Sequence, residues 1–325
     1  MKIHLCSAYR EHNALERFKH FATIDQHKKN QLCDRPEDAD IILFVEDAQF
    51  DDYLYSQLLT HPFVQQWRDK CFMYNEVDRP WVSLPGLYCS MPQASFEENR
   101  QRAFPYAATP NQRIQDIFAE GESTERPILF SFVGTGCNSL RKRMITVGQQ
   151  QGGTIIDTSG FNVWDCSEEE KRAQGDTFAS TLSQSKFALC PRGLGTSSFR
   201  LFETMQAGRA PVIIADDWVA PSEIDWSFAV RIKEADIDAL AERLSAISDE
   251  AFERGRAARA VWEQHYAPEQ MFNSACNNLR EIQHSATTKL SPLNTLLRRE
   301  QVRVQTAAIQ AAEYLRVYKR RLSST

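Results

Sequence analysis

Short apolar runs alternate with polar and helical stretches along the chain. In its first third, apolar runs at residues 2–5, 41–45 and 71–74 predict three strands. Residues 80–110 are rich in proline, aromatic and polar side chains, which favours irregular structure there. Residues 120–127 combine glycine, proline and charged side chains, so we expect a linker or domain boundary at that point.

The second part of the chain repeats a strand-then-helix pattern. Strands are predicted at residues 128–133, 154–157, 187–189, 211–214 and 229–232. Helices are predicted at residues 139–150, 168–185, 197–207, 234–245 and 249–266. This alternation is typical of a parallel sheet covered by helices on both faces. Ligands of such sheets bind at the carboxyl ends of the strands, so the loops that leave those ends are candidate sites.

The C-terminal segment, residues 291–325, predicts a long basic amphipathic helix at residues 293–322. Its apolar residues recur at spacings of three, four and seven and form a narrow apolar stripe. They are Leu297, Val304, Ala308, Ala311, Leu315, Tyr318 and Leu322. We expect this apolar stripe to pack on the chain's own surface. Oligomerisation is the first alternative, and peripheral membrane contact is weaker because the alanine-rich face buries little area.

Composition and charge exclude several classes of protein. A chain of 325 residues with 42% hydrophobic composition suffices for two domains. The formal net charge of -5 argues against a nucleic-acid partner. No stretch approaches the roughly 20 apolar residues of a transmembrane helix, and the first residues lack an apolar signal region. The eight cysteines show no C-x-x-C spacing, which favours reduced thiols and a cytoplasmic location.

The strongest candidate for chemistry is the segment at residues 187–208, which predicts a strand, a glycine-rich loop and a helix. Gly193 and Gly195 allow the backbone to approach a ligand closely. Ser197 and Ser198 stand where the helix is predicted to begin. The free backbone N–H groups and the positive end of the helix dipole favour an anion there, such as a phosphate.

Charged side chains in the same segment extend this interpretation. Arg192 and Arg200 carry guanidinium groups whose geometry suits phosphate oxygens. Ser197, Arg200 and Glu203 are three residues apart, so they share one face of the helix. The Glu203 carboxylate lies one to two turns along the helix from the phosphate site, where it could accept hydrogen bonds from ribose hydroxyls. The alternative is an ordinary capped helix with a surface pair between Arg200 and Glu203, which contributes little to stability.

A second glycine-bearing turn competes with the first. Gly134 and Gly136 follow a predicted strand and precede a helix, and Asp157 ends the next strand. This pattern is similar to the dinucleotide-binding fingerprint, with Ser139 in place of the third glycine. It keeps an NAD-dependent oxidoreductase open as an alternative function. In either case Arg141, one turn into the helix, lies near a phosphate-approaching turn.

Metal binding has little support in the sequence. Asp38 and Asp40 form a D-x-D pair, but they precede the strand at residues 41–45 instead of following it. We therefore expect them to lie away from the binding edge of the sheet, as solvated charges. The seven histidines show no metal-binding spacing. We expect neither a metal ion nor a cofactor.

The chain resembles the exostosin family, inverting glycosyltransferases of the two-lobed GT-B type. The resemblance covers about residues 128–266. It rests on five segments and one arginine: FVG at residues 132–134 with Arg141, SKFALCPRG at 185–193, GTSSFRLFE at 195–203, QAGRAPVII at 206–214, and the following loop with Asp217, Trp218, Pro221 and IDW at 224–226. It implies an α/β fold with two Rossmann-like lobes, a donor cleft between them and a long C-terminal helix. Residues 1–125 would form the acceptor-side lobe, residues 126–290 the donor lobe, and residues 291–325 the helix.

The resemblance also implies a substrate and a site. The donor would be a nucleotide-diphosphate sugar, with UDP as the expected nucleotide, and the acceptor a glycan or lipid-linked glycan. Glu203 would hold the ribose, and no metal would be needed. The other expected donor-binding residues are Gly134, Arg141, Arg192, Gly193, Gly195, Ser197, Ser198 and Arg200, with the diphosphate against residues 192–198 and Arg200.

Inversion also requires a base from the first lobe. Glu46 and Asp47 rank first because both directly follow an apolar strand, with Glu76 and His61 as further candidates. A non-catalytic subunit that binds sugar nucleotide and supports a partner transferase remains an alternative to an active enzyme.

Overall fold

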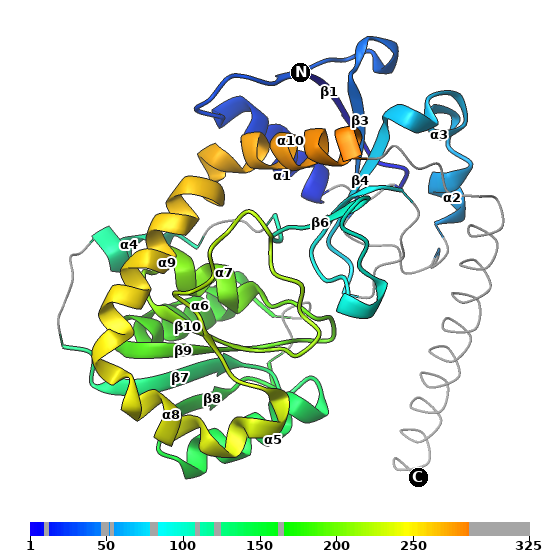
Figure 1. The fold of residues 1–325 in the computed structure, drawn as a ribbon. Helices are drawn as coiled ribbons and strands as arrows, with labels where there is room; N and C mark the ends of the chain where they lie inside the picture. Colours follow the sequence, from blue (N-terminus) through cyan, green and yellow to red (C-terminus); the bar gives the residue numbers. More distant parts are fainter. Residues whose placement is uncertain are drawn as a thin grey trace.

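The chain folds into two lobes, each built on its own parallel sheet (Figure 1). The computed structural model describes residues 1–9, 13–46, 52, 55–78, 84–107, 111–119, 125–161 and 166–285. The predictions for Asp47 and for the helix at residues 293–322 lie outside these residues. Two parallel sheets flanked by helices confirm the predicted α/β class.

The first lobe contains a six-stranded sheet in the order β2-β1-β3-β4-β5-β6, and every pair of neighbouring strands is parallel. Its strands are β1 (Lys2–Cys6), β2 (Gln31–Leu32), β3 (Ile41–Glu46), β4 (Cys71–Asn75), β5 (Gly86–Tyr88) and β6 (Gln101–Ala103). All residues of β3 and β4 are buried, which explains why both strands read as continuous apolar runs in the sequence.

The strands β5 and β6 correct the prediction of irregular structure at residues 80–110. Each has only three residues, too few for a detectable period of polar and apolar positions. Gly86 begins β5 in close contact with β4, where a Cβ atom would lie 1.9 Å from the carbonyl oxygen of Met73. The strand therefore depends on its neighbour, and a local sequence pattern does not show it.

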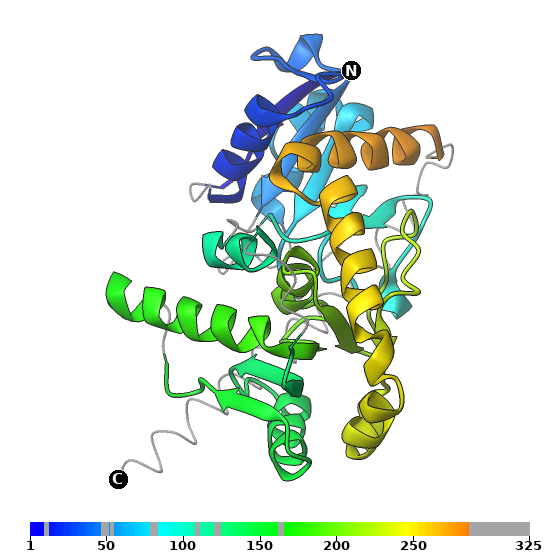
Figure 2. The same ribbon diagram turned by 90° about the vertical axis from the view of Figure 1, so that its left-hand side faces the viewer.

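Helices cover both faces of the first sheet. On one face α1 (Asn13–Ile24) packs beside α10 (Pro268–Ser285), and Phe18, Phe272 and Leu279 join one core cluster. On the other face lie α2 (Ser56–Leu59) and α3 (Pro62–Gln66). The helix α10 follows the second lobe in the chain but packs on the first, as Figure 2 shows.

The second lobe contains a five-stranded parallel sheet in the order β11-β10-β9-β7-β8. Its strands are β7 (Ile128–Gly134), β8 (Thr154–Asp157), β9 (Ser185–Pro191), β10 (Ala210–Ile214) and β11 (Val230–Arg231). The helices α5 (Ser139–Gln150) and α8 (Leu240–Ala246) pack on one face. On the other face lie α4 (Gln112–Ala119), α6 (Glu168–Ser183), α7 (Phe199–Gln206) and α9 (Ala251–His265).

This arrangement confirms the parallel sheet predicted for the second unit. Along β7 and β9, side chains alternate between the two helix layers: Phe130 and Phe187 face one core, and Val133 and Ala188 face the other. Residues 234–239, predicted as helix, form a 3-10 turn before α8. Within the described residues, no helix combines the length and hydrophobicity needed to cross a bilayer.

Candidate functional site

The carboxyl ends of the two sheets meet at the loop between β9 and α7, residues 192–198. Ser90, just after β5, accepts hydrogen bonds through Oγ from the backbone N–H groups of Thr196 (2.7 Å) and Ser197 (3.4 Å). The Thr196 hydroxyl donates in return to the carbonyl oxygen of Met91 at 3.3 Å. The glycine-rich loop of the second lobe therefore lies directly against the first lobe, and we call this contact the seam.

The N-terminus of α7 lies at the seam and carries two buried hydroxyls. The side chains of Ser197 and Ser198 are only 5% and 6% exposed. Neither hydroxyl oxygen has a hydrogen-bond partner in the part of the chain that the structure describes, and Ser198 makes no capping bond. Buried polar atoms without partners are uncommon and call for an explanation. Here they stand beside the positive end of a helix dipole, where an anion would satisfy them.

The two glycines of the loop have different surroundings. A Cβ atom on Gly195 would lie 1.9 Å from Ser90 Oγ and 2.9 Å from Asp78 Oδ1, so only glycine fits there. A Cβ atom on Gly193 would make an ordinary contact of 3.6 Å with the Arg141 guanidinium. The backbone at Gly195 thus approaches the opposite lobe closely, and the predicted approach of this loop to a ligand stays a prediction.

Arg141 binds the glycine-rich loop through hydrogen bonds to backbone carbonyl oxygens. Its Nε donates to the carbonyl oxygen of Arg192 and its Nη2 to that of Pro191, both at 3.0 Å. The Asn138 side chain caps α5 and donates to the carbonyl oxygen of Gly193 at 2.7 Å. Burial lowers the pKa of Arg141, but a guanidinium remains charged at neutral pH. Arg141 therefore orients the loop and adds positive charge next to it.

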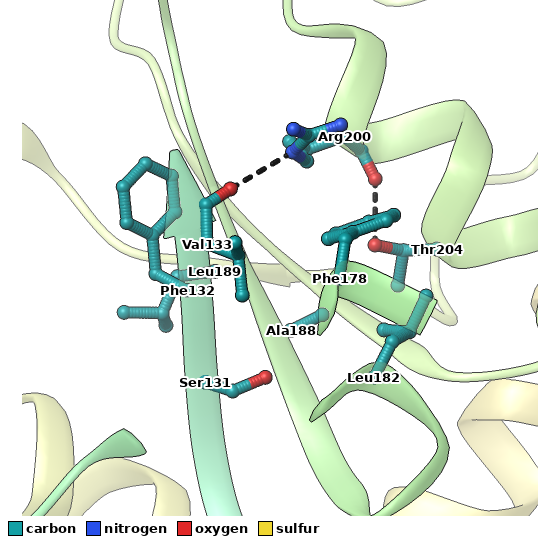
Figure 3. Close-up of a pocket in the computed structure, with 9 residues that line it drawn as sticks. All are labelled: Ser131, Phe132, Val133, Phe178, Leu182, Ala188, Leu189, Arg200 and Thr204. Carbon is teal, nitrogen blue, oxygen red and sulfur yellow. Dashed lines mark hydrogen bonds between the residues drawn. The ribbon is translucent and has the colours of Figure 1, made fainter. Parts of the chain in front are cut away.

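Arg200 points from the first turn of α7 toward the end of β7 (Figure 3). Its Nε donates to the carbonyl oxygen of Val133 at 3.0 Å, and its guanidinium lies over the Phe178 ring, 4.1 Å from the centroid. The same side chain pairs with Glu203. The shared helix face is as predicted, and so is the Arg200–Glu203 pair that the sequence offered as an alternative. Both side chains remain partly exposed, 30% for Arg200 and 24% for Glu203.

Arg192 points away from Arg200 and forms an ion pair with Glu234. Two hydrogen bonds, of 2.7 Å from Nε and 3.0 Å from Nη2, make the pair bidentate. These bonds raise the pKa of Arg192. Sequence reasoning missed Glu234, because the two residues are brought together only by the pairing of β9 with β10 and of β10 with β11.

A pocket that is partly open to solvent adjoins α7 on the side facing the first lobe. Phe199, Phe202 and Glu203 form its α7 wall, and Tyr106 and Tyr266 lie across from them. Phe199 is exposed although its ring stacks on that of Tyr106 with centroids 4.0 Å apart. Glu203 therefore stands between this pocket and Arg200.

The second glycine-bearing turn is assembled as its pattern predicts. Gly134 ends β7, and the Gly136 N–H donates to Ser159 Oγ at 2.8 Å. The Ser159 N–H donates to Asp157 Oδ1 at 2.9 Å, and the Ser159 hydroxyl keeps the pKa of Asp157 below its usual value. Ser159 thus closes the turn from within the chain and donates to one oxygen, Oδ1, of the carboxylate that would bind a ribose in a dinucleotide site.

The predicted base Glu46 ends β3 and is only 1% exposed. Its Oε1 accepts from the Ala8 N–H and its Oε2 from the Ser7 hydroxyl, both at 2.8 Å. Glu76 is likewise held inside the first lobe, by Arg17 at 3.0 Å and by the backbone N–H of Ala107. These two carboxylates fix the loops after β1 and β6.

Two further candidates differ in exposure. His61 caps α3 by accepting from the Phe63 N–H at 3.2 Å. Asp78, which sequence reasoning missed, is exposed at the carboxyl end of β4 and reaches Gly195 at the seam. Tyr106 donates to its Oδ1 at 3.2 Å. The signal for Asp78 was an acidic residue just after an apolar strand, the same signal that selected Glu46.

The D-x-D pair lies at the amino end of its sheet, as predicted. Asp40 precedes β3 and accepts from the Lys2 N–H at 2.7 Å, and Asp38 ends a 3-10 turn. Across the described ranges, no three His, Cys, Asp or Glu side chains gather closely enough to hold a metal ion. The eight cysteines all lie in the described ranges, and no disulfide joins them there.

The two parallel α/β lobes, which meet at the carboxyl ends of their strands, form the two-lobed architecture of GT-B glycosyltransferases. The family model of the Exostosin GT47 domain matches residues 60–247, more than half of the chain. The chain therefore belongs to the exostosin GT47 family, as the sequence resemblance indicated.

Curated relatives match parts of the chain. An Exostosin-1 homolog from Caenorhabditis elegans is 33% identical over 104 residues, 31% of this chain and 27% of that protein. A probable beta-1,4-xylosyltransferase (IRX10L) from Arabidopsis thaliana is 32% identical over 211 residues, 59% of this chain and 48% of that protein. The chain thus spans less than half the length of the curated relatives it matches.

Among solved structures, a glycosyltransferase from Rickettsia africae is 8% identical, with a TM-score of 0.47 over 89% of this chain and 99% of that chain.

Proposed function

We propose that the chain transfers a sugar from a nucleoside-diphosphate sugar, with UDP as the nucleotide, to a hydroxyl of a glycan or lipid-linked glycan. We further propose that transfer proceeds with inversion and without a metal ion. Membership of the exostosin GT47 family supports glycosyl transfer. The observation that carries the donor site is the pair of buried, unpartnered hydroxyls of Ser197 and Ser198 at the start of α7.

The donor diphosphate would lie against residues 193–198, at the N-terminus of α7. Backbone N–H groups and the helix dipole supply positive potential there, and the two serine hydroxyls supply donors. Arg200 and Arg141 add fixed positive charge on the side of β7. Hydrogen-bond donors and positive charges beside the developing charge stabilise a leaving diphosphate, which is the role a metal ion has in other transferases.

Glu203 would accept hydrogen bonds from the ribose hydroxyls. It lies on the second turn of α7, on the face that carries Arg200 toward the phosphates. At about 1.5 Å of rise per residue, Glu203 stands about 8 Å along the helix from Ser198, within reach of the ribose of a nucleotide whose phosphates bind at the helix start. The pairing with Arg200 orients the carboxylate before the donor arrives.

Inversion needs a base that removes the proton of the acceptor hydroxyl as its oxygen attacks the anomeric carbon. The bond between that carbon and the phosphate oxygen breaks, and the diphosphate leaves with the electron pair. Glu46 and Asp47 are the bases proposed from the sequence. We propose Asp78 as a further candidate, because it is exposed and lies at the seam beside the proposed phosphate loop.

A ligand panel followed by turnover tests this function. UDP and UDP-sugars should raise the melting temperature in the presence of EDTA, and NAD(H) should not. Donors that bind are then incubated with glycan acceptors, and the product mass is measured. A shift with NAD(H) alone favours the oxidoreductase, and donor binding without any transfer favours the non-catalytic subunit. Activity that is lost with EDTA and restored by manganese or magnesium would refute the metal-free mechanism.

A further inference from the structure

Ser90 places a first-lobe oxygen on the loop proposed for the donor phosphates. Its Oγ accepts from two consecutive backbone N–H groups, those of Thr196 and Ser197. Consecutive N–H groups that converge on one oxygen at the start of a helix form the kind of concave site that binds phosphate. Each N–H has one hydrogen, so a phosphate oxygen and Ser90 Oγ compete for the same donors.

Ser90 is held in this position from several sides. It is fully buried. Gly195 leaves no room for another atom beside Ser90 Oγ, because a Cβ there would lie 1.9 Å away. A phosphate cannot enter between Ser90 and these N–H groups while the seam stays as it is.

We propose that Ser90 competes with the donor diphosphate for the N–H groups of Thr196 and Ser197, so that donor binding releases this part of the seam. The proposal rests on the proposed function, which places the diphosphate on this loop. Ser90 then weakens donor affinity and links it to the contact between the lobes. By linkage, a donor that separates Ser90 from the loop binds more tightly when the contact is already broken.

Other contacts keep the lobes joined when Ser90 is released. The Gln93 N–H donates to the carbonyl oxygen of Asp217 at 3.1 Å, and Pro92 forms a β-bridge with Trp218. The helix α10 packs in the core of the first lobe while its Asn278 side chain donates to Glu223 of the second at 3.3 Å. The donor therefore needs to displace only the contact between Ser90 and residues 195–197.

The test compares the full-length chain with Ser90→Ala by calorimetric titration of UDP, inorganic pyrophosphate and uridine. We expect Ser90→Ala to bind UDP roughly two- to tenfold more tightly, the range of one net hydrogen bond. Pyrophosphate should gain by the same factor and uridine should not change, because the competition involves the phosphates alone. The variant should also melt at a lower temperature, since the seam loses a contact.

Ser95→Ala is the matched control, because Ser95 lies in the same connection after β5 but is exposed. It should leave all three affinities unchanged. If Ser90→Ala does not fold, Ser90→Gly serves the same comparison. Unchanged or weaker binding of UDP and pyrophosphate by these variants overturns the proposal, and weaker binding would make Ser90 a donor ligand. If neither compound binds wild type or variant, the proposed function fails and this proposal fails with it.

Discussion

At the scale of single residues, the site consists of side chains that already have partners in the protein. Arg192 is paired with Glu234, Arg141 with loop carbonyls, and Arg200 with Val133 and Glu203. Such partners hold a side chain in one rotamer before a ligand arrives, which reduces the entropy lost on binding. The buried hydroxyls at the start of α7 are different, because they lack partners and gain most from an anion.

Arg200→Ala tests the phosphate contact. Removing a charge-assisted hydrogen bond should cost about 1.5–3 kcal/mol of UDP binding, roughly 10- to 150-fold in affinity. Uridine should lose much less, because it carries no phosphate. Arg143→Ala is the control: Arg143 is an exposed residue of α5 that pairs with Asp238 away from the seam. Equal UDP affinities for wild type and a folded Arg200→Ala protein would remove Arg200 from the site.

Glu203→Gln tests the ribose contact. The amide keeps the size of the side chain but offers one acceptor oxygen, so at least one hydrogen bond to the ribose is lost. We expect roughly 10- to 150-fold weaker UDP binding and a small change in stability. Wild type should also discriminate against the 2′-deoxy analogue. If the change costs at most about 1 kcal/mol of unfolding free energy and leaves both affinities alone, Glu203 is a surface pair with Arg200 only.

A comparison of two carboxylates locates the base. Asp78→Asn should lower kcat strongly while UDP affinity changes little, because the exposed carboxylate faces the seam and has no place in the core. Glu46→Gln should instead lower the unfolding free energy, by about 1–3 kcal/mol, because Glu46 is buried and accepts two hydrogen bonds. The reverse pattern, with kcat lost only in Glu46→Gln, would return the assignment to the end of β3.

At the scale of elements, the strands and helices of the second lobe follow from local pattern. The alternation of apolar strands with amphipathic helices predicted α5 at its observed bounds and placed α7 within two residues of its start. The glycine-rich loop at residues 192–198 was identified because its residue types are unusual between a strand and a helix. By contrast, Ser90 and Asp78 could not be assigned, because their role depends on contacts with residues more than a hundred positions away.

Gly195→Ala tests how tightly the two elements meet at the seam. The added methyl group would overlap Ser90 Oγ and lie 2.7 Å from the carbonyl oxygen of Asp78, so the backbone must shift. We expect a loss of about 1–3 kcal/mol in unfolding free energy, the usual range for overpacking. Gly160→Ala is the control, since a Cβ there meets nothing within 4 Å among the described residues. Similar melting temperatures for the two variants would show that the seam is looser than described.

At the scale of the whole molecule, α10 is the element that returns the chain to the first lobe. Phe272 and Leu279 are almost completely buried in the core formed with α1 and the first sheet. Truncating such residues to alanine costs about 2–5 kcal/mol. The chain thus returns to the first lobe through α10, before the segment at residues 293–322 begins.

Deleting residues 293–325 tests what the apolar residues predicted for the helix at residues 293–322 contact. The deletion leaves α10 and all residues of the proposed donor site in place, so we expect unchanged UDP affinity. If the segment packs on its own chain, the melting temperature or the solubility should fall, because burial contributes roughly 25 cal/mol per Å² of apolar area. The mass from light scattering should then be that of a monomer before and after deletion. A full-length oligomer that becomes a stable monomer on deletion would show instead that the apolar stripe of this segment joins two copies of the chain.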